Sequence, residues 1–510
     1  MAFAKKKFLM VSPMFDFGPF LPINISIIIA VLEQANYEVK LFDTTFYRIP
    51  KKSQKFQDID TSVGMFKPVN WDGYGMDDLK DDYIGDFNNL IKSFQPDFIG
   101  VSIFTTFNEN LANSLINAIG SDYPGHVIVG GMHSYINLDR VKSNKRVDAI
   151  INGESEHCII DALGFLSGES TLTLNEIANL HVCNPAGEWE SSNKKGITNL
   201  EVQPFLNWNH FDERNFYRPF DGKILRMGHV EMARGCPFKC TYCINEFFHE
   251  HYPNSKPYKI SKTKTDKGYW RLKTVKRFLE EVDYLQKKHN LNAIKIWDDD
   301  FLAMGMDTVQ EVTQGIYKMG LKFLCHSRPE HMNNDKMKIL GENGCIQIGV
   351  GVECGSPTYR EKMLGRKMQD STVINAFANC RKHGIIASAF CMIGMPDETR
   401  EDILMTARLL REANPHVIVS AIFTPYEGNS LYEYAKKRGY IDDNIDYEDF
   451  WSCFLNMPSI PKEDVENMYR VFRFYCRLDD SFYPKIELAE KDDSLLCELV
   501  AELKNTKNHG

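Results

Sequence analysis

Apolar runs alternate with amphipathic segments along most of this chain. In residues 1–190, apolar stretches such as "KKFLMVSP", "DFIGVSIF" and "HVIVGG" are separated by segments with helical spacing, such as "INISIIIAVLEQANY". Strands that alternate with helices predict a parallel, doubly wound α/β sheet, and strands that are apolar throughout fit burial on both faces. Residues 45–82 interrupt this rhythm with polar, aromatic, Gly and Pro residues, which indicate an insertion with long loops.

A second alternating region follows a polar linker at residues 191–225. Six apolar segments, each followed by a helical pattern, predict six strands at 229–234, 293–298, 322–327, 346–353, 385–394 and 416–424. Six β/α units in succession predict a partial, TIM-type (β/α)6 barrel over residues 226–435. The last segment, residues 436–510, is charged and predicted to be mostly helical, with the aromatic stripe "NMYRVFRFYCRLDDSFY".

Composition narrows the class of protein. A chain of 510 residues that is 43% hydrophobic and 25% charged is expected to form more than one soluble globular domain. The net charge of −9 argues against a nucleic-acid partner. No apolar run reaches the length of a membrane span, and the N-terminus lacks the pattern of a signal peptide. The thirteen cysteines, mostly single and in apolar runs, indicate free thiols in a reducing, cytoplasmic location.

Three cysteines stand close together in "ARGCPFKCTYC", residues 233–243, just after the first predicted barrel strand. Active sites of such barrels lie at the carboxyl ends of the strands. Thiolates at this spacing bind iron–sulfur clusters or zinc, and three of them leave one corner of a four-iron cluster open for chemistry. Two other interpretations stay open on spacing alone: a structural zinc ion with His249 or a remote residue as fourth ligand, and three unconnected thiols.

The C-x3-C-x2-C spacing after the first strand of a β/α barrel resembles the radical S-adenosylmethionine (radical SAM) superfamily. The resemblance implies that Cys236, Cys240 and Cys243 bind a [4Fe–4S] cluster, and that S-adenosylmethionine occupies its fourth iron through amino and carboxylate groups. Tyr242 matches the family's usual aromatic contact with adenine. Reductive cleavage of S-adenosylmethionine would then give a 5'-deoxyadenosyl radical.

Further segments match this family in the expected order. They are "DDDF" (298–301), "GVECGSP" (351–357), "MLGRKM" (363–368), "IGMPDET" (393–399) and "TPYEGNSLYE" (424–433). The resemblance implies contacts with S-adenosylmethionine for Asp298, Asp299, Glu353, Gly355 and Arg366. Each segment alone also has a plainer interpretation: the aspartates can cap a loop, Glu353 can form an ordinary salt bridge, and Gly-x-Pro is a common turn.

The predicted N-terminal sheet carries three distinctive loops, "GVSIFTTFNENL" (100–111), "VGGMH" (129–133) and "INGESE" (151–156). Taken by themselves they predict a ligand crevice at the carboxyl ends of the strands. Together they resemble the cobalamin-binding domain that precedes the barrel in one large radical SAM subfamily. The residues that would line the path of cobalamin are Ser102, Thr105, Thr106, Gly130 and Gly131.

The first loop, "SPMFDFGPFLP" (12–22), departs from the pattern of cobalamin domains that ligate cobalt through Asp-x-His-x-x-Gly. It contains no histidine, and His133 on another loop is not proposed as the axial ligand. The resemblance therefore implies cobalamin bound without histidine ligation, and it leaves open that the domain has lost cobalamin. The predicted domains are a Rossmann-like cobalamin domain (1–190), a linker (191–225), a radical SAM barrel (226–435) and a helical C-terminal region (436–510).

The pairing of these two domains implies an enzyme in which methylcobalamin methylates an unactivated carbon of a small-molecule substrate. An electron donor such as flavodoxin or ferredoxin would reduce the cofactors. No catalytic side chain is assigned. The alternatives are a cobalamin-dependent ring contraction, cyclisation or rearrangement without methyl transfer, and a corrinoid- or metal-binding protein that is not an enzyme. The insertion and the C-terminal region are expected to cover the cleft and select the substrate.

Overall fold

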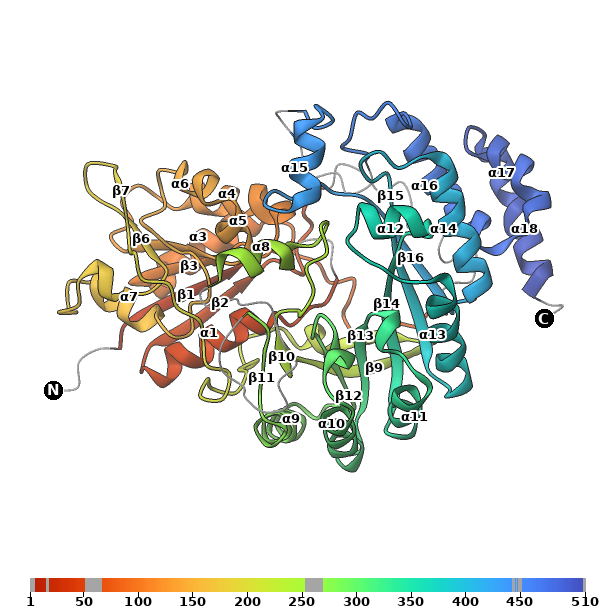
Figure 1. The fold of residues 1–510 in the computed structure, drawn as a ribbon. Helices are drawn as coiled ribbons and strands as arrows, with labels where there is room; N and C mark the ends of the chain where they lie inside the picture. Colours follow the sequence, from red (N-terminus) through yellow and green to blue (C-terminus); the bar gives the residue numbers. More distant parts are fainter. Residues whose placement is uncertain are drawn as a thin grey trace. The chain divides into compact units, whose positions relative to one another are not determined.

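The computed structural model describes residues 5–14, 18–50, 67–252, 269–442, 445, 447 and 452–507. The chain divides into two compact units (Figure 1). The first comprises residues 1–50, 71–218 and 251–277, and the second comprises residues 51–70, 219–250 and 278–510. The segment 251–277, which the sequence analysis placed within the barrel, thus belongs to the first unit. Residues 51–66 of the predicted insertion lie outside the described residues.

The sheet of the first unit has the strand order β2-β1-β3-β4-β5-β6-β7. Its strands are β1 (Lys7–Ser12), β2 (Glu38–Asp43), β3 (Phe98–Ser102), β4 (His126–Gly130), β5 (Ala149–Ile151), β6 (Leu180–Cys183) and β7 (Trp189–Ser191). The first five pair in parallel, which confirms the predicted sheet, whereas β6 and β7 add an antiparallel edge that the sequence analysis did not predict.

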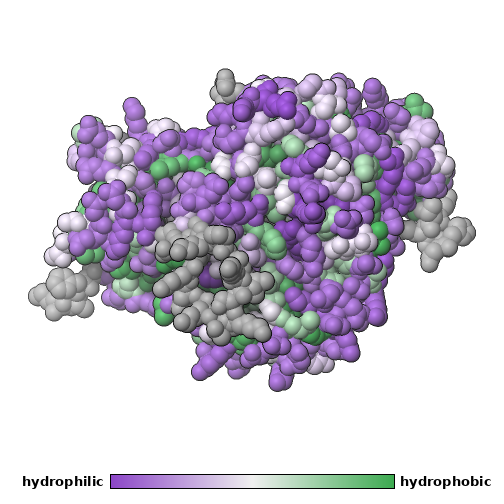
Figure 2. Space-filling model, in the orientation of Figure 1, coloured by the Kyte–Doolittle hydropathy of each residue, from purple (hydrophilic) through white to green (hydrophobic). Residues whose placement is uncertain are grey.

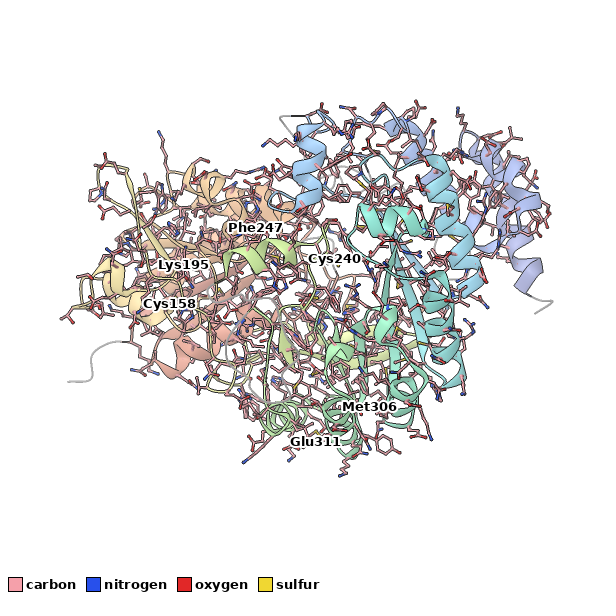
Figure 3. The ribbon with its side chains drawn as sticks, in the orientation of Figure 1. Cys158, Lys195, Cys240, Phe247, Met306 and Glu311 are labelled. Atoms are coloured by element: carbon pink, nitrogen blue, oxygen red, sulfur yellow. The ribbon has the colours of Figure 1, made fainter. Side chains whose placement is uncertain are left out.

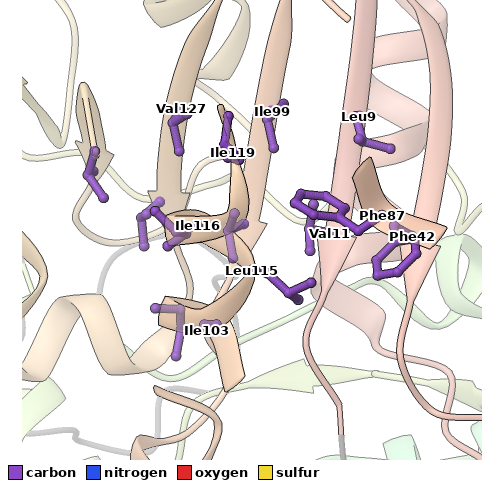
Figure 4. Packing of buried hydrophobic residues seen from close by; sticks show 14 of the residues in the cluster. Leu9, Val11, Phe42, Phe87, Ile99, Ile103, Leu115, Ile116, Ile119 and Val127 are labelled. Carbon is purple, nitrogen blue, oxygen red and sulfur yellow. The ribbon is translucent and has the colours of Figure 1, made fainter. Parts of the chain in front are cut away.

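Helices connect the parallel strands of the first unit. They are α1 (Ile23–Gln34), α3 (Tyr83–Phe94), α4 (Glu109–Ala118), α5 (Met132–Ile136), α6 (Leu138–Lys142) and α7 (Ile159–Leu166), with short 3-10 turns η1 (Thr106–Asn108), η2 (Leu174–Glu176) and η3 (Glu213–Phe216). Alternate strand residues such as Leu9 and Val11 pack against Phe87 of α3 and Leu115 of α4 (Figure 4). This buried layer joins the helices to the sheet, and the predicted ligand loops begin at the carboxyl ends of the same strands.

The second unit contains a seven-stranded sheet in the order β16-β15-β14-β13-β12-β9-β8. Its strands are β8 (Tyr217–Phe220), β9 (Lys223–Val230), β12 (Ala293–Ile296), β13 (Lys322–Ser327), β14 (Cys345–Glu353), β15 (Ile386–Ile393) and β16 (Val417–Ile422). The six strands from β9 to β16 pair in parallel and form a half-barrel, as predicted. Two short strands, β10 (Ala233–Arg234) and β11 (Arg271–Leu272), lie in the long connection after β9.

Helices of the half-barrel follow the strands in sequence. They are α8 (Ile244–His251), α9 (Val275–His289), α10 (Met306–Lys318), α11 (Asn334–Glu342), α12 (Pro357–Lys362), α13 (Asp370–Lys382), α14 (Arg400–Ala413) and α15 (Ser430–Lys437), with turns η4 (Phe301–Ala303) and η5 (Pro329–His331). In α9, the buried residues Phe278, Val282 and Leu285 recur at helical spacing and form its inner face. In α14, Thr399 and Asp402 form a capping box that fixes where the helix begins.

The C-terminal region is helical, as predicted. It contains α16 (Lys462–Arg477), α17 (Tyr483–Ala489) and α18 (Leu496–Lys507), with turns η6 (Asp480–Phe482) and η7 (Asp493–Leu495). Helix α16 packs on α14 and β16, and the Tyr469 hydroxyl donates to the carbonyl of Ser420 at 3.1 Å.

Within the described part of the chain, no helix combines the length and the hydrophobicity of a membrane span. On the face drawn in Figure 2, hydrophobic residues form only small, separated patches.

Candidate active site

The three clustered cysteines lie on the loop between β10 and α8, at the carboxyl end of the first barrel strand. Gly235 starts this loop with a φ of 85°, a left-handed backbone that glycine adopts without strain. Cys236 and Cys240 are buried, and Cys243 is partly exposed. Figure 3 labels Cys240 on this loop and Phe247 on the following helix. The loop therefore presents its thiols at the edge of the half-barrel where chemistry is expected.

Contacts from distant parts of the second unit fix this loop in place. Asn429 donates to the carbonyl of Tyr242 at 3.3 Å and caps α15 by accepting from Tyr432 N at 2.8 Å. Leu431 N donates to the carbonyl of Thr241 at 2.9 Å. Glu246 accepts from both Ser430 N and Ser430 Oγ at 2.8 Å. The segment after β16 thus holds the third cysteine and the start of α8.

His249, the fourth ligand in the zinc interpretation, is engaged with the backbone of the loop. Its Nε2 donates to the carbonyl oxygen of Cys236 at 2.7 Å. Asn245, on the first turn of the same helix, approaches Cys243 with its Nδ2 3.4 Å from Sγ. Both side chains therefore support the loop that carries the thiols.

The environment of the thiols fits an iron–sulfur cluster. Burial raises the pKa of all three, that of Cys243 to about 12, so thiolates here need metal coordination to form. Among the described residues, no three His, Cys, Asp or Glu side chains converge on a position for one metal ion. A four-iron cluster holds its thiolates farther apart than a single ion does, and three thiols from one loop match its donor set.

Three consecutive aspartates at the end of β12 occupy different environments. Asp298 is buried, its Oδ1 accepts from Met232 N at 2.8 Å and Ala233 N at 3.0 Å, and burial raises its pKa to about 8. Asp300 is also buried and accepts from Ser327 Oγ at 2.7 Å. Asp299 keeps access to solvent, although crowding by protein atoms raises its pKa to about 6. Asp299 is therefore the aspartate that faces open space beside the cysteine loop.

Three of the predicted S-adenosylmethionine contacts meet at one point. Arg366 Nη1 lies 3.4 Å from Glu353 Oε1 and 3.5 Å from the Tyr242 hydroxyl. Glu353 ends β14 with a φ of 68°, an unusual backbone for a residue with a side chain. Burial raises the Glu353 pKa, and the Arg366 guanidinium partly offsets this. The buried Nε of Arg366 has no hydrogen-bond partner among the described residues.

Sequence reasoning missed two charged residues of this site, Arg328 and Glu330. Both follow the buried strand β13, and Glu330 joins two guanidiniums because it contacts Arg328 Nη2 at 2.5 Å and Arg366 Nη2 at 3.5 Å. Arg328 Nη1 also approaches Cys240 Sγ at 3.5 Å. The one signal in the sequence was their position, since "SRPE" places two opposite charges directly at the end of an apolar barrel strand.

Gly355 and Arg360 organise the segment that connects Glu353 with Arg366. A Cβ on Gly355 would lie 2.3 Å from Thr406 Cα, so this glycine allows close packing on α14, and its N–H donates to Thr406 Oγ1 at 2.7 Å. Arg360 is fully buried and donates to the carbonyls of Cys354 and Met368 at 3.0 Å. Contact of Gly355 with a cofactor stays a prediction, whereas its packing role is evident.

The predicted cobalamin residues lie at the carboxyl ends of β3 and β4. Ser102 Oγ accepts from Asn24 Nδ2 at 3.0 Å. The Thr105 hydroxyl donates to Asn108 Oδ1 at 2.8 Å within a capping box. Thr106 is buried, and its hydroxyl lies 3.2 Å from His133 Nδ1. These hydroxyls thus have partners within the first unit, and their contact with a corrinoid stays a prediction.

Gly130 and Gly131 end β4 and begin the next turn. Gly131 has a φ of 100°, and a Cβ there would lie 2.4 Å from the carbonyl oxygen of Ile103. Among the described residues, the atom nearest to a Cβ on Gly130 would be the carbonyl oxygen of Ile151, at 3.9 Å. His133 is fully buried, with Nε2 3.7 Å from Glu109 Oε1, so it supports the turn from within the unit.

Comparison with known proteins agrees with this geometry. The sequence profile of the Radical SAM superfamily matches residues 230–410, which include the cysteine loop and the network of Tyr242, Glu353 and Arg366. The chain belongs to the radical SAM superfamily. Radical SAM enzymes use a [4Fe–4S] cluster and S-adenosylmethionine, so these are cofactors of this enzyme.

Similarity to curated radical SAM relatives extends beyond the barrel. An uncharacterised methyltransferase of Pyrococcus horikoshii is 24% identical over 427 residues, covering 82% of this chain and 85% of the relative. Cytidylyl-2-hydroxyethylphosphonate methyltransferase of Streptomyces wedmorensis is 20% identical over 506 residues, covering 91% of this chain and 88% of the relative. Both alignments are longer than the barrel alone.

Among solved structures, the radical SAM methyltransferase TsrM of Kitasatospora setae, with cobalamin and a [4Fe–4S] cluster bound, is similar. Its TM-score is 0.62 at 14% identity, covering 86% of this chain and 80% of that protein. At this identity the likeness supports the fold: an α/β protein with a doubly wound sheet and a half-barrel.

Proposed function

We propose that this radical SAM enzyme binds cobalamin in its first unit and methylates an unactivated carbon of a small molecule. The observation that carries the proposal is the extent of the similarity: both reported relatives are methyltransferases, and each alignment covers more than four fifths of the chain. A barrel enzyme without the second cofactor would share only the barrel. Ring contraction and non-enzymatic corrinoid binding have less support. Cyclisation is the alternative that a relative supports, since the anaerobic magnesium-protoporphyrin IX monomethyl ester cyclase of Rubrivivax gelatinosus is 22% identical and covers 84% of this chain. We favour methyl transfer because the two methyltransferases are covered over 85% and 88% of their own length, against 74% for the cyclase.

The proposed roles in the second unit follow from the geometry. Cys236, Cys240 and Cys243 would hold the cluster, which supplies the electron that cleaves S-adenosylmethionine. Arg366 is the basic residue that we propose for the carboxylate of S-adenosylmethionine, because its guanidinium lies beside Tyr242 of the cysteine loop. Tyr242 and Glu353 hold that guanidinium in one orientation. Asp299, which is solvent-accessible, would face the amino group of the same ligand.

The proposed roles in the first unit are those of a corrinoid cradle. Bound cobalamin would supply the methyl group that a carbon radical accepts. A Cβ on Gly130, at the end of β4, would meet no atom closer than the Ile151 carbonyl oxygen at 3.9 Å among the described residues, and Ser102 lies at the end of the adjacent strand β3. The loop "SPMFDFGPFLP" has no histidine, so we propose binding without histidine ligation; residues 15–17 of this loop lie outside the described residues.

The location and the electron source complete the proposal. The enzyme would act in the cytoplasm, where buried free thiols and a reducible cluster persist. A low-potential carrier such as flavodoxin or ferredoxin would supply electrons to the cluster. The C-terminal helices and the segment 45–82 would select the substrate.

The products of S-adenosylmethionine test this function without a known substrate. The anaerobically reconstituted protein is incubated with S-adenosylmethionine and a chemical reductant, with and without added hydroxocobalamin. We expect 5'-deoxyadenosine in both samples, and S-adenosylhomocysteine only where corrinoid is present. Formation of 5'-deoxyadenosine without any corrinoid-dependent S-adenosylhomocysteine would contradict methyl transfer.

A further inference from the structure

Arg328 makes three contacts beside the cysteine loop, one of them with the middle cysteine. Its Nη1 lies 3.5 Å from Cys240 Sγ, and its guanidinium stacks on Phe238 at 3.8 Å from the ring centroid. Phe238 lies within the same loop, between the first two cysteines. Glu330 accepts from Nη2 at 2.5 Å and fixes the other edge of the guanidinium. The side chain of Arg328 is 14% exposed, so this charge sits largely away from water.

Glu330 balances the charge of Arg328. Its two carboxylate oxygens contact two different guanidiniums, Oε1 that of Arg328 and Oε2 that of Arg366. The side chain of Glu330 is 26% exposed, whereas that of Arg366 is 1% exposed. Two cations and one shared anion therefore lie on the side of the loop that carries Cys240, and Glu353 supplies a further negative charge beside Arg366.

Contacts of this kind change the reduction potential of an iron–sulfur cluster. Hydrogen bonds to cluster sulfurs, the net charge nearby and exposure to solvent set that potential. Reduction adds one negative charge to the cluster, so a cation beside a ligand sulfur favours the reduced state and raises the potential. An anion acts in the opposite direction, and the effect is strongest where water is excluded.

We propose that Arg328 and Glu330 act as a charge pair that sets the reduction potential of the cluster, with Arg328 raising it and Glu330 moderating that increase. Arg328 is a positioning residue in this account, since it acts on the cluster through Cys240. The inference rests on the cluster that the proposed function requires, but it is independent of cobalamin and of methyl transfer.

A purely structural role for Arg328 makes a different prediction. If the side chain only held Phe238 and the loop in place, its removal would lower cluster occupancy, and the potential of the clusters that remain would be unchanged. If the charge matters, the potential changes even where iron content is normal. The sign of the change separates the two residues, because Arg328 and Glu330 carry opposite charges.

The experiment is an EPR-monitored redox titration of the full chain with its cluster reconstituted anaerobically, in the absence of S-adenosylmethionine. The variants are Arg328→Met, Arg328→Lys and Glu330→Gln. The matched arginine control is Arg381→Met, because Arg381 donates to the carbonyls of Ala413 and Asn414. The reductant supplies the single electron that the cluster accepts. We expect Arg328→Met to shift the midpoint to a more negative potential and Glu330→Gln to a more positive one. Arg328→Lys should fall between Arg328→Met and the native chain, and Arg381→Met should not shift.

An unchanged midpoint in Arg328→Met with full iron content would overturn the inference, as would shifts of the same sign in Arg328→Met and Glu330→Gln. Should Arg328→Met fail to hold the cluster, the signs of Arg328→Lys and Glu330→Gln decide, because both keep side chains able to hydrogen-bond. Failure of the proposed function would appear differently: the native chain would give a titratable cluster but no corrinoid-dependent S-adenosylhomocysteine.

Discussion

Gly130 and Gly131, at the end of β4, differ in whether the fold requires a glycine at that position. Gly131 is required by the fold, since its φ of 100° and the nearby Ile103 carbonyl leave no place for a Cβ. Gly130 has no such restriction, because the nearest atom to a Cβ there is 3.9 Å away. Packing therefore does not require a glycine at position 130, and the proposed corrinoid cradle gives it a role.

Alanine at each glycine tests this difference. We expect Gly131→Ala to lower the free energy of unfolding by about 1–3 kcal/mol, because the backbone of Ile103 must move. Gly130→Ala should have the same unfolding temperature as the native chain but bind less corrinoid. Thermal unfolding and corrinoid content after reconstitution measure the two effects. Normal corrinoid content in Gly130→Ala would count against its place in the cradle.

Glu398 is a buried carboxylate in the turn after β15. It is fully buried, accepts from Met395 N at 3.1 Å, and has its pKa raised to about 8 because burial disfavours the charged form. The folded state therefore holds this proton between about pH 4.3, the ordinary value for glutamate, and pH 8, while the unfolded state has lost it. In that interval the folded chain binds more protons, so stability falls as the pH rises.

Substitution of Glu398 by glutamine should remove this part of the pH dependence. We expect the unfolding temperature of the native chain to fall between pH 5 and pH 8, and that of Glu398→Gln to fall less over the same interval. Differential scanning calorimetry at several pH values measures both slopes. Equal slopes in the two proteins would show that Glu398 is ionised throughout the range.

At the scale of elements, a buried ion pair attaches residues 269–277 to the sheet of the first unit. Arg271 hydrogen-bonds Glu154, which follows β5, and donates to the carbonyl of Thr198 at 3.1 Å. Glu154 also accepts from Thr198 N at 2.7 Å and from the Tyr252 hydroxyl at 3.3 Å. The "INGESE" loop thus anchors a remote piece of chain.

Removal of the Glu154 carboxylate would leave the charge of Arg271 buried without its partner, which lowers the free energy of unfolding. We expect Glu154→Gln to lower the free energy of unfolding by about 3 kcal/mol and to speed hydrogen exchange in residues 269–277. The control is Glu169→Gln, because Glu169 pairs with Lys6 at the surface, where ion pairs contribute less than about 1 kcal/mol. Unchanged exchange in residues 269–277 would show that Glu154 does not anchor the segment.

Elements with a strong periodic pattern were predictable, and contacts between distant residues were not. The third barrel strand was predicted at 322–327 and is β13 with the same bounds. The edge strands β6 and β7 are short and their sequences are weakly apolar, so the pattern gave no signal; their turn depends on Asn184, which accepts from Ala186 N and Glu188 N at 3.0 Å. The meeting of Arg328, Glu330 and Arg366 depends on tertiary structure, which spacing along the chain does not encode.

At the scale of the whole molecule, the chain joins a doubly wound unit to a half-barrel, and each unit contains one candidate cofactor site. The second unit presents three thiols beside a charged network in which Arg366 is buried and Arg328, Glu330 and Glu353 are half-buried. The first presents paired glycines at the carboxyl edge of its sheet. The account as a whole therefore requires two cofactors on one chain, held by separate sets of residues.

The most direct test is the iron and corrinoid content of the anaerobically purified protein, supplied with iron, sulfide and hydroxocobalamin, beside a variant with Cys236, Cys240 and Cys243 all changed to alanine. The account predicts about four irons per native chain, as a [4Fe–4S] cluster requires, together with bound corrinoid. The variant should lose the iron and keep the corrinoid. Zinc in place of iron, or iron without corrinoid in the native chain, would contradict the account.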